Sequence, residues 1–122
     1  MKQTGTLFWI TGISGVGKTT LAQLLYDKLA PQNKNLVLLD GDELRRIMML
    51  PNDYSLAERK KASQRYSYLC HSLTLQNINV ICATISLFKE IQQWNRRNIK
   101  NYIEIFIDLP IPKSRYRKVK TS

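Results

Sequence analysis

The stretch GISGVGKTT at residues 12–20 has the residue types and spacing of a phosphate-binding loop. Gly12, Gly17, Lys18 and Thr19 fit the pattern G-x-x-x-x-G-K-[ST]. Glycines let successive backbone N–H groups face one anion, and a following helix N-terminus adds positive potential. Lys18 would reach the β- and γ-phosphates, and the Thr19 hydroxyl would ligate Mg²⁺. The residues that we expect to bind ATP are Gly12, Ile13, Ser14, Gly15, Val16, Gly17, Lys18, Thr19 and Thr20.

Two acidic residues follow the next apolar run of the chain. Asp40 and Asp42 close the segment LVLLDGD at 36–42, about twenty residues after the loop. A carboxylate at this place can accept the proton of an acceptor hydroxyl if its pKa stays low among Lys and Arg side chains. A GTPase would need a guanine-reading Asn-Lys-x-Asp motif, and NKNL at 33–36 lacks the Asp. The pattern favours a small-molecule kinase over a GTPase or a motor ATPase.

Short apolar runs alternate with stretches of helical spacing along the chain. Buried strands are predicted for the runs at 7–11, 35–40, 78–85 and 102–108. Helices are predicted over 18–30, 43–49, 55–76 and 87–99. Apolar strands that alternate with helices are typical of a parallel sheet covered on both faces. The sequence predicts one domain with a three-layer α/β fold and four parallel strands.

The same spacing predicts which helix faces are buried. Ser55 and Glu58 form a capping box that opens the longest helix. The residues expected to face the sheet are Leu21, Leu24, Leu25 and Leu29 in the first helix, Ala62, Tyr66, Leu69 and Leu73 in the long helix, and Phe88, Ile91 and Trp94 in the last helix.

Composition limits the class of protein. The net charge is +10, and residues 113–122 contribute five basic and no acidic side chains, so much of the excess is a tail. A basic balance suits anionic small molecules, and nucleic acid is not expected as a partner. Cys70, Cys82 and His71 are too few for a disulfide framework or a metal cluster, so we expect buried free thiols. No apolar run is long enough to span a membrane or to act as a signal peptide, and we expect a cytoplasmic protein.

The segments FWITGISGVGKTT, LDGDELR, YSLAERKKASQRY and ICATISLFKE resemble the adenylylsulfate kinases in order and spacing. The resemblance covers about residues 5–109. It implies a P-loop kinase fold with ATP and Mg²⁺ as cofactors. It also implies transfer of the γ-phosphate of ATP to the 3′-hydroxyl of adenosine 5′-phosphosulfate, the activation step of sulfate assimilation.

The resemblance implies roles for individual residues. Asp42 would accept or orient the proton of the acceptor hydroxyl. Arg45 and Arg59 would grip the anionic end of the acceptor, which suits guanidinium geometry, although Arg59 could also be a solvated helix charge. Tyr54 stands where the family has a Phe that stacks on adenine. Asp40 would hold a magnesium-bound water or, equally, be a turn residue that ends the strand.

Ile85 and Ser86 match the Ile-Ser of the family's Ile-Ser-Pro motif. Family descriptions give this serine a phosphoserine intermediate, but direct in-line transfer needs no covalent step. We therefore expect Ser86 to contact substrate through its backbone or hydroxyl. Together with Lys18 and Asp42, Ser86 completes the candidate catalytic set.

Three positions depart from the family pattern. Ala62 replaces an Asn, Leu87 replaces the Pro, and Lys89 replaces an Arg. CATIS at 82–86 and WNRRNI at 94–99 resemble a divergent branch whose acceptor is another nucleotide, such as a cytidine diphosphate derivative in surface-polysaccharide synthesis. The acceptor is therefore open between adenylylsulfate, the leading candidate, and such a derivative.

The last expectation concerns the end of the chain. Residues 1–110 are assigned to the kinase domain, incomplete at its C-terminal end, and 111–122 to a basic tail. DLPIPKSRYRKVKTS at 108–122 resembles neither the lid nor the last strand of the family. We expect the edge along 102–108 to lack a partner strand and to favour homo-oligomers. We also expect weak transfer activity, and a nucleotide-binding remnant is the alternative to an active kinase.

Overall fold

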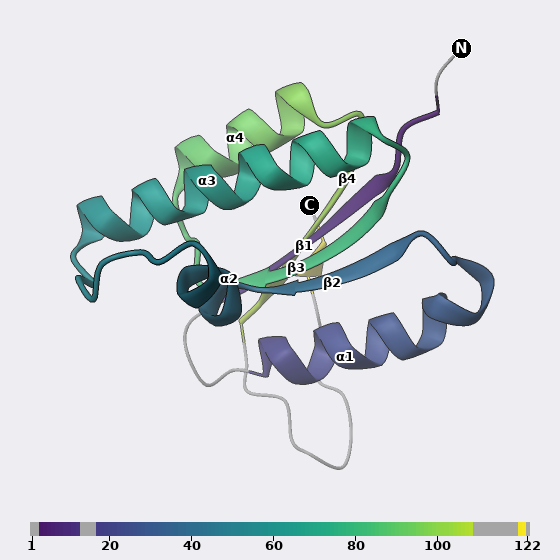
Figure 1. Cartoon of the computed structure of the whole chain (residues 1–122), viewed down its shortest axis with the longest axis horizontal. Helices are drawn as coiled ribbons and strands as arrows, with labels where there is room; N and C mark the ends of the chain where they lie inside the picture. Colours follow the sequence, from purple (N-terminus) through teal and green to yellow (C-terminus); the bar gives the residue numbers. More distant parts are fainter. Residues whose placement is uncertain (1–2, 13–16, 109–119, 122) are drawn as a thin grey trace.

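Four parallel strands form the middle layer of the computed structural model, which describes residues 3–12, 17–108 and 120–121. The strands are β1 (Thr6–Gly12), β2 (Leu36–Asp40), β3 (Asn79–Thr84) and β4 (Asn101–Ile107). They lie in the order β2-β3-β1-β4 and pair in parallel (Figure 1). The predicted parallel sheet is confirmed, and β1, which leads into the phosphate-loop segment, lies inside it.

Helices cover both faces of this sheet (Figure 1). One face carries α1 (Lys18–Leu29), which is followed by the short 3₁₀ helix η1 (Ala30–Gln32). The opposite face carries α3 (Leu56–Leu75) and α4 (Lys89–Asn98), which pack side by side. The short helix α2 (Gly41–Ile47) follows β2 directly. The arrangement confirms the three-layer α/β fold.

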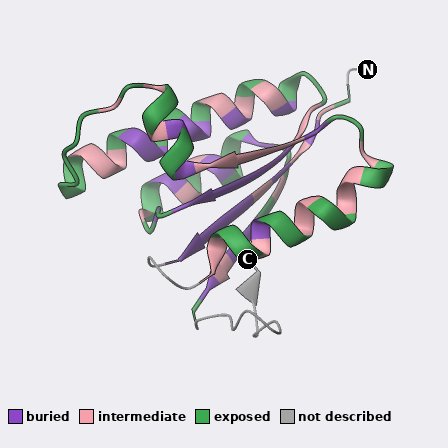
Figure 2. Ribbon diagram, turned by 60° about the horizontal axis from the view of Figure 1, so that its bottom comes forward, coloured by how far each residue is buried: buried purple, intermediate pink, exposed green. Residues whose placement is uncertain are grey.

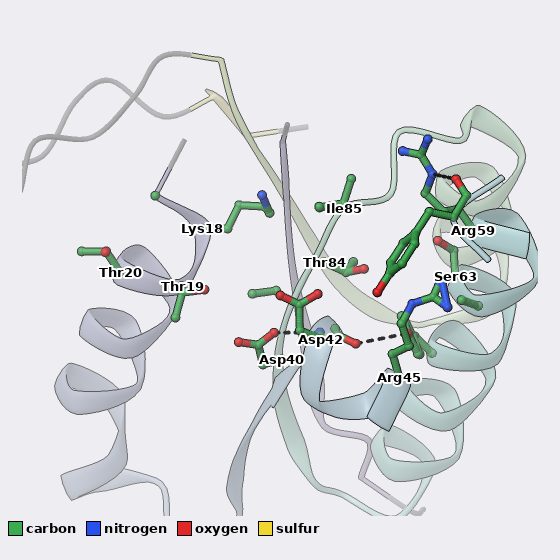
Figure 3. A pocket seen from close by; sticks show the side chains of 16 residues that line it. Lys18, Thr19, Thr20, Asp40, Asp42, Arg45, Arg59, Ser63, Thr84 and Ile85 are labelled. Carbon is green, nitrogen blue, oxygen red and sulfur yellow. Dashed lines mark hydrogen bonds between the residues drawn. The ribbon is translucent and has the colours of Figure 1, made fainter. Parts of the chain in front are cut away.

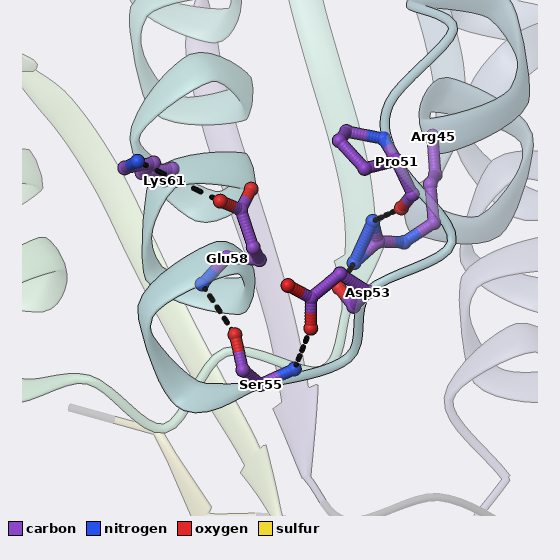
Figure 4. A network of polar contacts seen from close by, with 6 residues as sticks. All are labelled: Arg45, Pro51, Asp53, Ser55, Glu58 and Lys61. Atoms are coloured by element: carbon purple, nitrogen blue, oxygen red, sulfur yellow. Dashed lines mark hydrogen bonds and ion pairs between the residues drawn. The ribbon is translucent and has the colours of Figure 1, made fainter.

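The start of α3 is built by half of the predicted capping box. The Ser55 hydroxyl accepts a hydrogen bond from the Glu58 backbone N–H at 3.3 Å. The Glu58 carboxylate pairs with Lys61 at 3.6 Å rather than with the Ser55 N–H, which donates to the Asp53 carboxylate at 2.9 Å (Figure 4). The backbone N–H groups of Ser55 and Glu58 are thus both hydrogen-bonded. The Asp53 carboxylate accepts from the Ser55 N–H, as the Glu58 carboxylate was expected to do.

Hydrophobic side chains form two cores, one on each face of the sheet, and the inner strands are buried along most of their length (Figure 2). Side chains of β1 alternate between them: Leu7 and Trp9 pack with α3 and α4, whereas Ile10 packs with α1. All three are fully buried. This alternation fixes β1 in the sheet, because a slip of one residue would exchange its two faces.

The buried face of α1 differs from the predicted one. Ala22 is its buried residue, and Leu21, Leu25 and Leu29 pack around it, half-buried. Leu24 is 42% exposed, so its predicted place in the core is wrong. At about 3.6 residues per turn, Leu24 lies roughly 200° around the helix from Ala22. The small alanine, not a leucine, marks the line of closest approach to the sheet.

A fifth strand pairs with the edge formed by β4. This strand, β5 (Lys120–Thr121), is antiparallel to β4 and pairs with Ile105 and Phe106. The expectation that the edge lacks a partner strand is therefore wrong at these two positions. That the chain end resembles neither the lid nor the last strand of the family stays a prediction. A homo-oligomer formed through this edge stays a prediction.

Two further expectations can be compared with the described residues. Cys70 and Cys82 are free and buried, as predicted. Both lie in the core between α3 and the sheet. Within the described ranges, no helix is long and apolar enough to cross a membrane.

We predict that Gly5→Ala destabilises the fold. The Gly5 N–H donates to the Thr74 carbonyl at 2.8 Å, which ties the chain entering β1 to the end of α3. A Cβ at this position would lie 2.0 Å from the carbonyl oxygen of Ile78, a backbone atom that cannot swing away. The free energy of unfolding should fall by about 2 kcal/mol or more in urea titrations, with an unchanged slope.

The matched control for this variant is Gln3→Ala, which changes an exposed side chain two residues earlier. It should shift the unfolding midpoint little. Equal stability of Gly5→Ala and the wild type would show that the entrance to β1 relaxes without cost.

Candidate active site

A cavity of about 410 Å³ opens beside the carboxyl ends of β2 and β3 (Figure 3). In parallel α/β sheets this is where ligands bind, because the loops after the strands converge there. A volume of this size suits a small-molecule ligand. The sequence-predicted site residues that line the cavity are Gly17, Lys18, Thr19, Thr20, Asp40, Asp42, Arg45, Tyr54, Arg59 and Ile85.

The predicted ATP-binding loop is described only at its two ends. Ile13, Ser14, Gly15 and Val16 lie outside the described residues. Gly12 ends β1, and Gly17 precedes α1 with a left-handed backbone, φ 99° and ψ 24°. Other residue types pay for this conformation, whereas glycine adopts it freely. The left-handed backbone therefore explains why the motif has a glycine at position 17.

Lys18 is the first residue of α1 and lines the cavity. Burial lowers its pKa, and the charges of Asp42 and then Asp40 oppose that shift. Opposition of this kind requires that both carboxylates lie near the ammonium group. The lysine of α1 and the acids around the start of α2 thus face one cavity.

Asp40 ends β2 and caps α2. Its carboxylate accepts a hydrogen bond from the Asp42 backbone N–H at 2.9 Å. Of the two roles left open for Asp40, the turn residue is thus the one with a contact in the structure, and the magnesium role stays a prediction. Asp42 lies in the first turn of α2 with an exposed side chain that borders the cavity.

Arg45 holds the loop between α2 and α3. Its guanidinium donates to the Pro51 carbonyl at 3.2 Å and makes a long 3.5 Å contact to the Asp53 carbonyl (Figure 4). The same group lies 4.6 Å from the centroid of the Tyr54 ring, within the range of a cation–π interaction. These contacts use two of the five N–H donors of Arg45.

Arg59 holds the same loop from the α3 side. Its Nε donates to the Tyr54 carbonyl at 2.8 Å. Both arginines thus build one wall of the cavity before any ligand enters, a task that the motif alone did not predict. In Figure 3, Lys18 and Thr19 lie on one side of the cavity and Arg45 and Arg59 on the other, with Asp42 between them.

Ser86 lies away from the cavity. It is fully buried and is not among the lining residues, whereas its neighbour Ile85 is. The Thr11 hydroxyl donates to the Ser86 carbonyl at 2.7 Å and accepts from the Ser86 N–H at 3.1 Å. The expected contact between Ser86 and substrate stays a prediction, and in the structure the Ser86 backbone is bonded to Thr11.

Three polar residues were not predicted as part of the site. Ser63, Tyr66 and Thr84 are each buried to more than nine-tenths and line the cavity. Residues 59, 62, 63 and 66 share one face of α3, because side chains three, four and seven positions apart align on a helix. Once Arg59 was assigned to the site, this spacing could have located Ser63 and Tyr66.

Among the described residues, no group of three His, Cys, Asp or Glu side chains could hold a metal ion by itself. The Thr19 hydroxyl and the carboxylates of Asp40 and Asp42 are among the oxygen groups that line this cavity. Mg²⁺ prefers oxygen ligands, and its sites are usually completed by water and by substrate phosphates. The residues present therefore fit Mg²⁺ bound together with a nucleotide.

The chain matches the family model for adenylylsulphate kinase over residues 4–121. The match extends past residue 109, where the recognised motifs end. A cytidine diphosphoramidate kinase of Campylobacter jejuni is 43% identical over 108 residues, which are 88% of this chain and 63% of that protein. An adenylyl-sulfate kinase of Gloeothece citriformis is 34% identical over 120 residues, 98% of this chain and 68% of that protein. The chain thus spans about two thirds of the length of these relatives.

A solved structure of an adenylylsulfate kinase is also similar to this chain. An APS kinase of Mycobacterium tuberculosis in complex with AMPPNP and APS superimposes with a TM-score of 0.76 and 29% identity. The superposition covers 89% of this chain and 65% of that protein. The fold inferred from the sequence and the family resemblance are both confirmed.

We predict that Lys18→Ala weakens ATP binding at least tenfold, about 1.4 kcal/mol. The ammonium group is the cation that α1 brings to the cavity beside the two carboxylates. Isothermal titration with ATP and Mg²⁺ measures the change. Lys28→Ala, in the exposed last turn of the same helix, is the control that should bind as the wild type does. Equal affinity of a folded Lys18→Ala protein would contradict the assignment.

Proposed function

The chain belongs to the adenylylsulphate kinase family, and from this premise we propose that it transfers the γ-phosphate of ATP to a hydroxyl of a nucleotide acceptor. The observation that carries the proposal is one cavity with two chemically different sides. Lys18 and Thr19 border it from α1, Arg45 and Arg59 border it from α2 and α3, and Asp42 lies between them. A kinase needs this order of donor phosphate, proton acceptor and acceptor anchor.

On the donor side, Gly17 and Lys18 bind the phosphates of ATP. The left-handed Gly17 opens α1, so the backbone N–H groups of its first turn are available to an anion. Lys18 carries positive charge to the transferred group. Thr19, with Asp40, holds Mg²⁺, which neutralises phosphate charge when it is bound.

On the acceptor side, Asp42 takes the proton of the attacking hydroxyl as the oxygen bonds to the γ-phosphorus and ADP leaves. A carboxylate at the cavity border is a suitable proton acceptor for a hydroxyl bound there. Arg45 and Arg59 hold an anionic group of the acceptor with the N–H donors that the loop carbonyls leave over. Tyr54 offers an exposed aromatic ring for a base to stack on.

For the acceptor we favour a cytidine diphosphate derivative. The supporting observation is the 43% identity to a cytidine diphosphoramidate kinase, against 34% to an adenylyl-sulfate kinase. The departure of Ala62 from the adenylylsulfate kinase pattern lies in the cavity itself. Adenylylsulfate, which the motifs imply and which gives the family its name, is the second candidate. Its activation would make the chain part of sulfate assimilation.

Asp42→Asn should lower kcat for transfer by about 10²-fold or more, while the affinity for ATP changes little. The amide keeps the shape of the side chain but cannot take the proton. Turnover assays and ATP titration measure the two quantities. Glu43→Gln is the control, because it neutralises an exposed neighbour whose contact is to Arg46 on the helix surface. Full turnover in Asp42→Asn would show that another group orients the hydroxyl.

The acceptor is tested by direct comparison. We expect kcat/KM for cytidine diphosphoramidate to exceed that for adenylylsulfate by at least about tenfold, a difference of about 1.4 kcal/mol in transition-state binding. A preference for adenylylsulfate would select the second candidate. Phosphorylation of a simple sugar alone would overturn the nucleotide acceptor. ATP binding without transfer to any of these would indicate the nucleotide-binding remnant.

A further inference from the structure

Tyr66 contacts the backbone next to the proposed proton acceptor. Its hydroxyl lies 3.1 Å from the carbonyl oxygen of Gly41, and because a carbonyl can only accept, the phenol donates this hydrogen bond. Tyr66 is 4% exposed and lies on α3, 25 residues along the chain from Gly41. The bond therefore ties α3 to the peptide that joins Gly41 and Asp42.

The same peptide is held from two other sides. The Asp40 carboxylate accepts from the Asp42 N–H at 2.9 Å. Gly41 packs against the end of β3 so closely that a Cβ would lie 3.0 Å from the Thr84 hydroxyl and 3.3 Å from the Ala83 carbonyl oxygen. The first turn of α2 is thus fixed by contacts from β2, β3 and α3.

These contacts matter because the orientation of a helix as short as α2 depends on its contacts with other elements. It has seven residues, and helices of that length are marginal without tertiary contacts. The Asp42 side chain is exposed at the cavity border, so its direction follows from the backbone that carries it. A misplacement of about 1 Å in a reacting group can cost roughly 10²-fold in rate.

We propose that Tyr66 is a positioning residue for phosphoryl transfer. Its hydrogen bond to the Gly41 carbonyl holds the peptide that sets the direction of the Asp42 carboxylate in the cavity. The inference rests on the proposed function, in which Asp42 takes the proton of the acceptor hydroxyl.

The phenol can serve as a permanent donor. Burial raises the pKa of Tyr66, and Arg45 opposes the shift. Among the other titratable groups near the phenol, Cys82 and Asp42 raise its pKa and Arg65 lowers it. The hydroxyl therefore keeps its proton at neutral pH, as donation to a carbonyl requires.

The test is Tyr66→Phe, which removes the hydroxyl and keeps the ring that packs in the core. We expect kcat to fall about tenfold with an unchanged KM for ATP, because ATP binds on the α1 side. Tyr102→Phe is the matched control. It removes the hydroxyl of a half-buried tyrosine, which donates to Glu104 at 2.8 Å on β4, outside the cavity lining. It should change stability and leave kcat as it is.

A double-mutant cycle separates positioning from a general loss of structure. If Tyr66 acts through Asp42, Tyr66→Phe should cost nothing further once Asp42→Asn is present. Additive losses in kcat would overturn the inference.

A second readout does not need transfer activity. If the Tyr66 hydroxyl holds the peptide between Gly41 and Asp42, its removal should speed hydrogen exchange at the Asp42 N–H, which donates to the Asp40 carboxylate. NMR should show this faster exchange in Tyr66→Phe and not in Tyr102→Phe. Unchanged exchange at Asp42 in Tyr66→Phe would overturn the inference. Absence of transfer by the wild type would overturn the proposed function instead, and the exchange rate would still decide whether Tyr66 holds the peptide that carries Asp42.

Discussion

The two hydrogen bonds between the Thr11 hydroxyl and the Ser86 backbone are the contacts on which the site depends. Thr11 is fully buried at the end of β1, one residue before the phosphate-loop motif begins. By donating to the Ser86 carbonyl and accepting from its N–H, one side chain joins the ends of β1 and β3. The carboxyl ends of β1 and β3 are thus held together, and Ile85 lines the cavity whereas Ser86 is buried.

Charged side chains of both signs line the cavity. Burial alone would push Lys18 toward its neutral form, and the carboxylates of Asp42 and Asp40 oppose that tendency. On the opposite side of the cavity, Arg45 and Arg59 each donate a hydrogen bond to a backbone carbonyl of the loop between α2 and α3. Those contacts order the loop and keep each guanidinium at the cavity wall. An anion then meets cations whose positions are already determined, which lowers the entropic cost of binding.

The sequence was sufficient where the physical cause is local. The apolar runs predicted all four parallel strands, and the glycine pattern located the turn that precedes Lys18. It was insufficient where tertiary contacts decide. Leu24 is exposed because Ala22 lets α1 approach the sheet most closely, and a pattern of leucines does not reveal that. The motif that assigned Ser86 to substrate could not predict that this serine is fully buried, with its backbone bonded to Thr11. The pairing of β5 with β4 has no apolar signal.

The two halves of the site therefore follow different rules. The proposed ATP side is encoded by neighbours in sequence, since Gly17, Lys18 and Thr19 belong to the start of α1 and the residue before it. The proposed acceptor side is assembled from α2, α3, the loop between them and the end of β3, and its buried polar residues, Ser63, Tyr66 and Thr84, come from α3 and β3. The two proposed sides thus come from different parts of the chain, so substitutions on this face of α3 need not change the phosphate-loop motif. This separation is compatible with the similarity of one chain to relatives named for two acceptors, adenylyl-sulfate and cytidine diphosphoramidate.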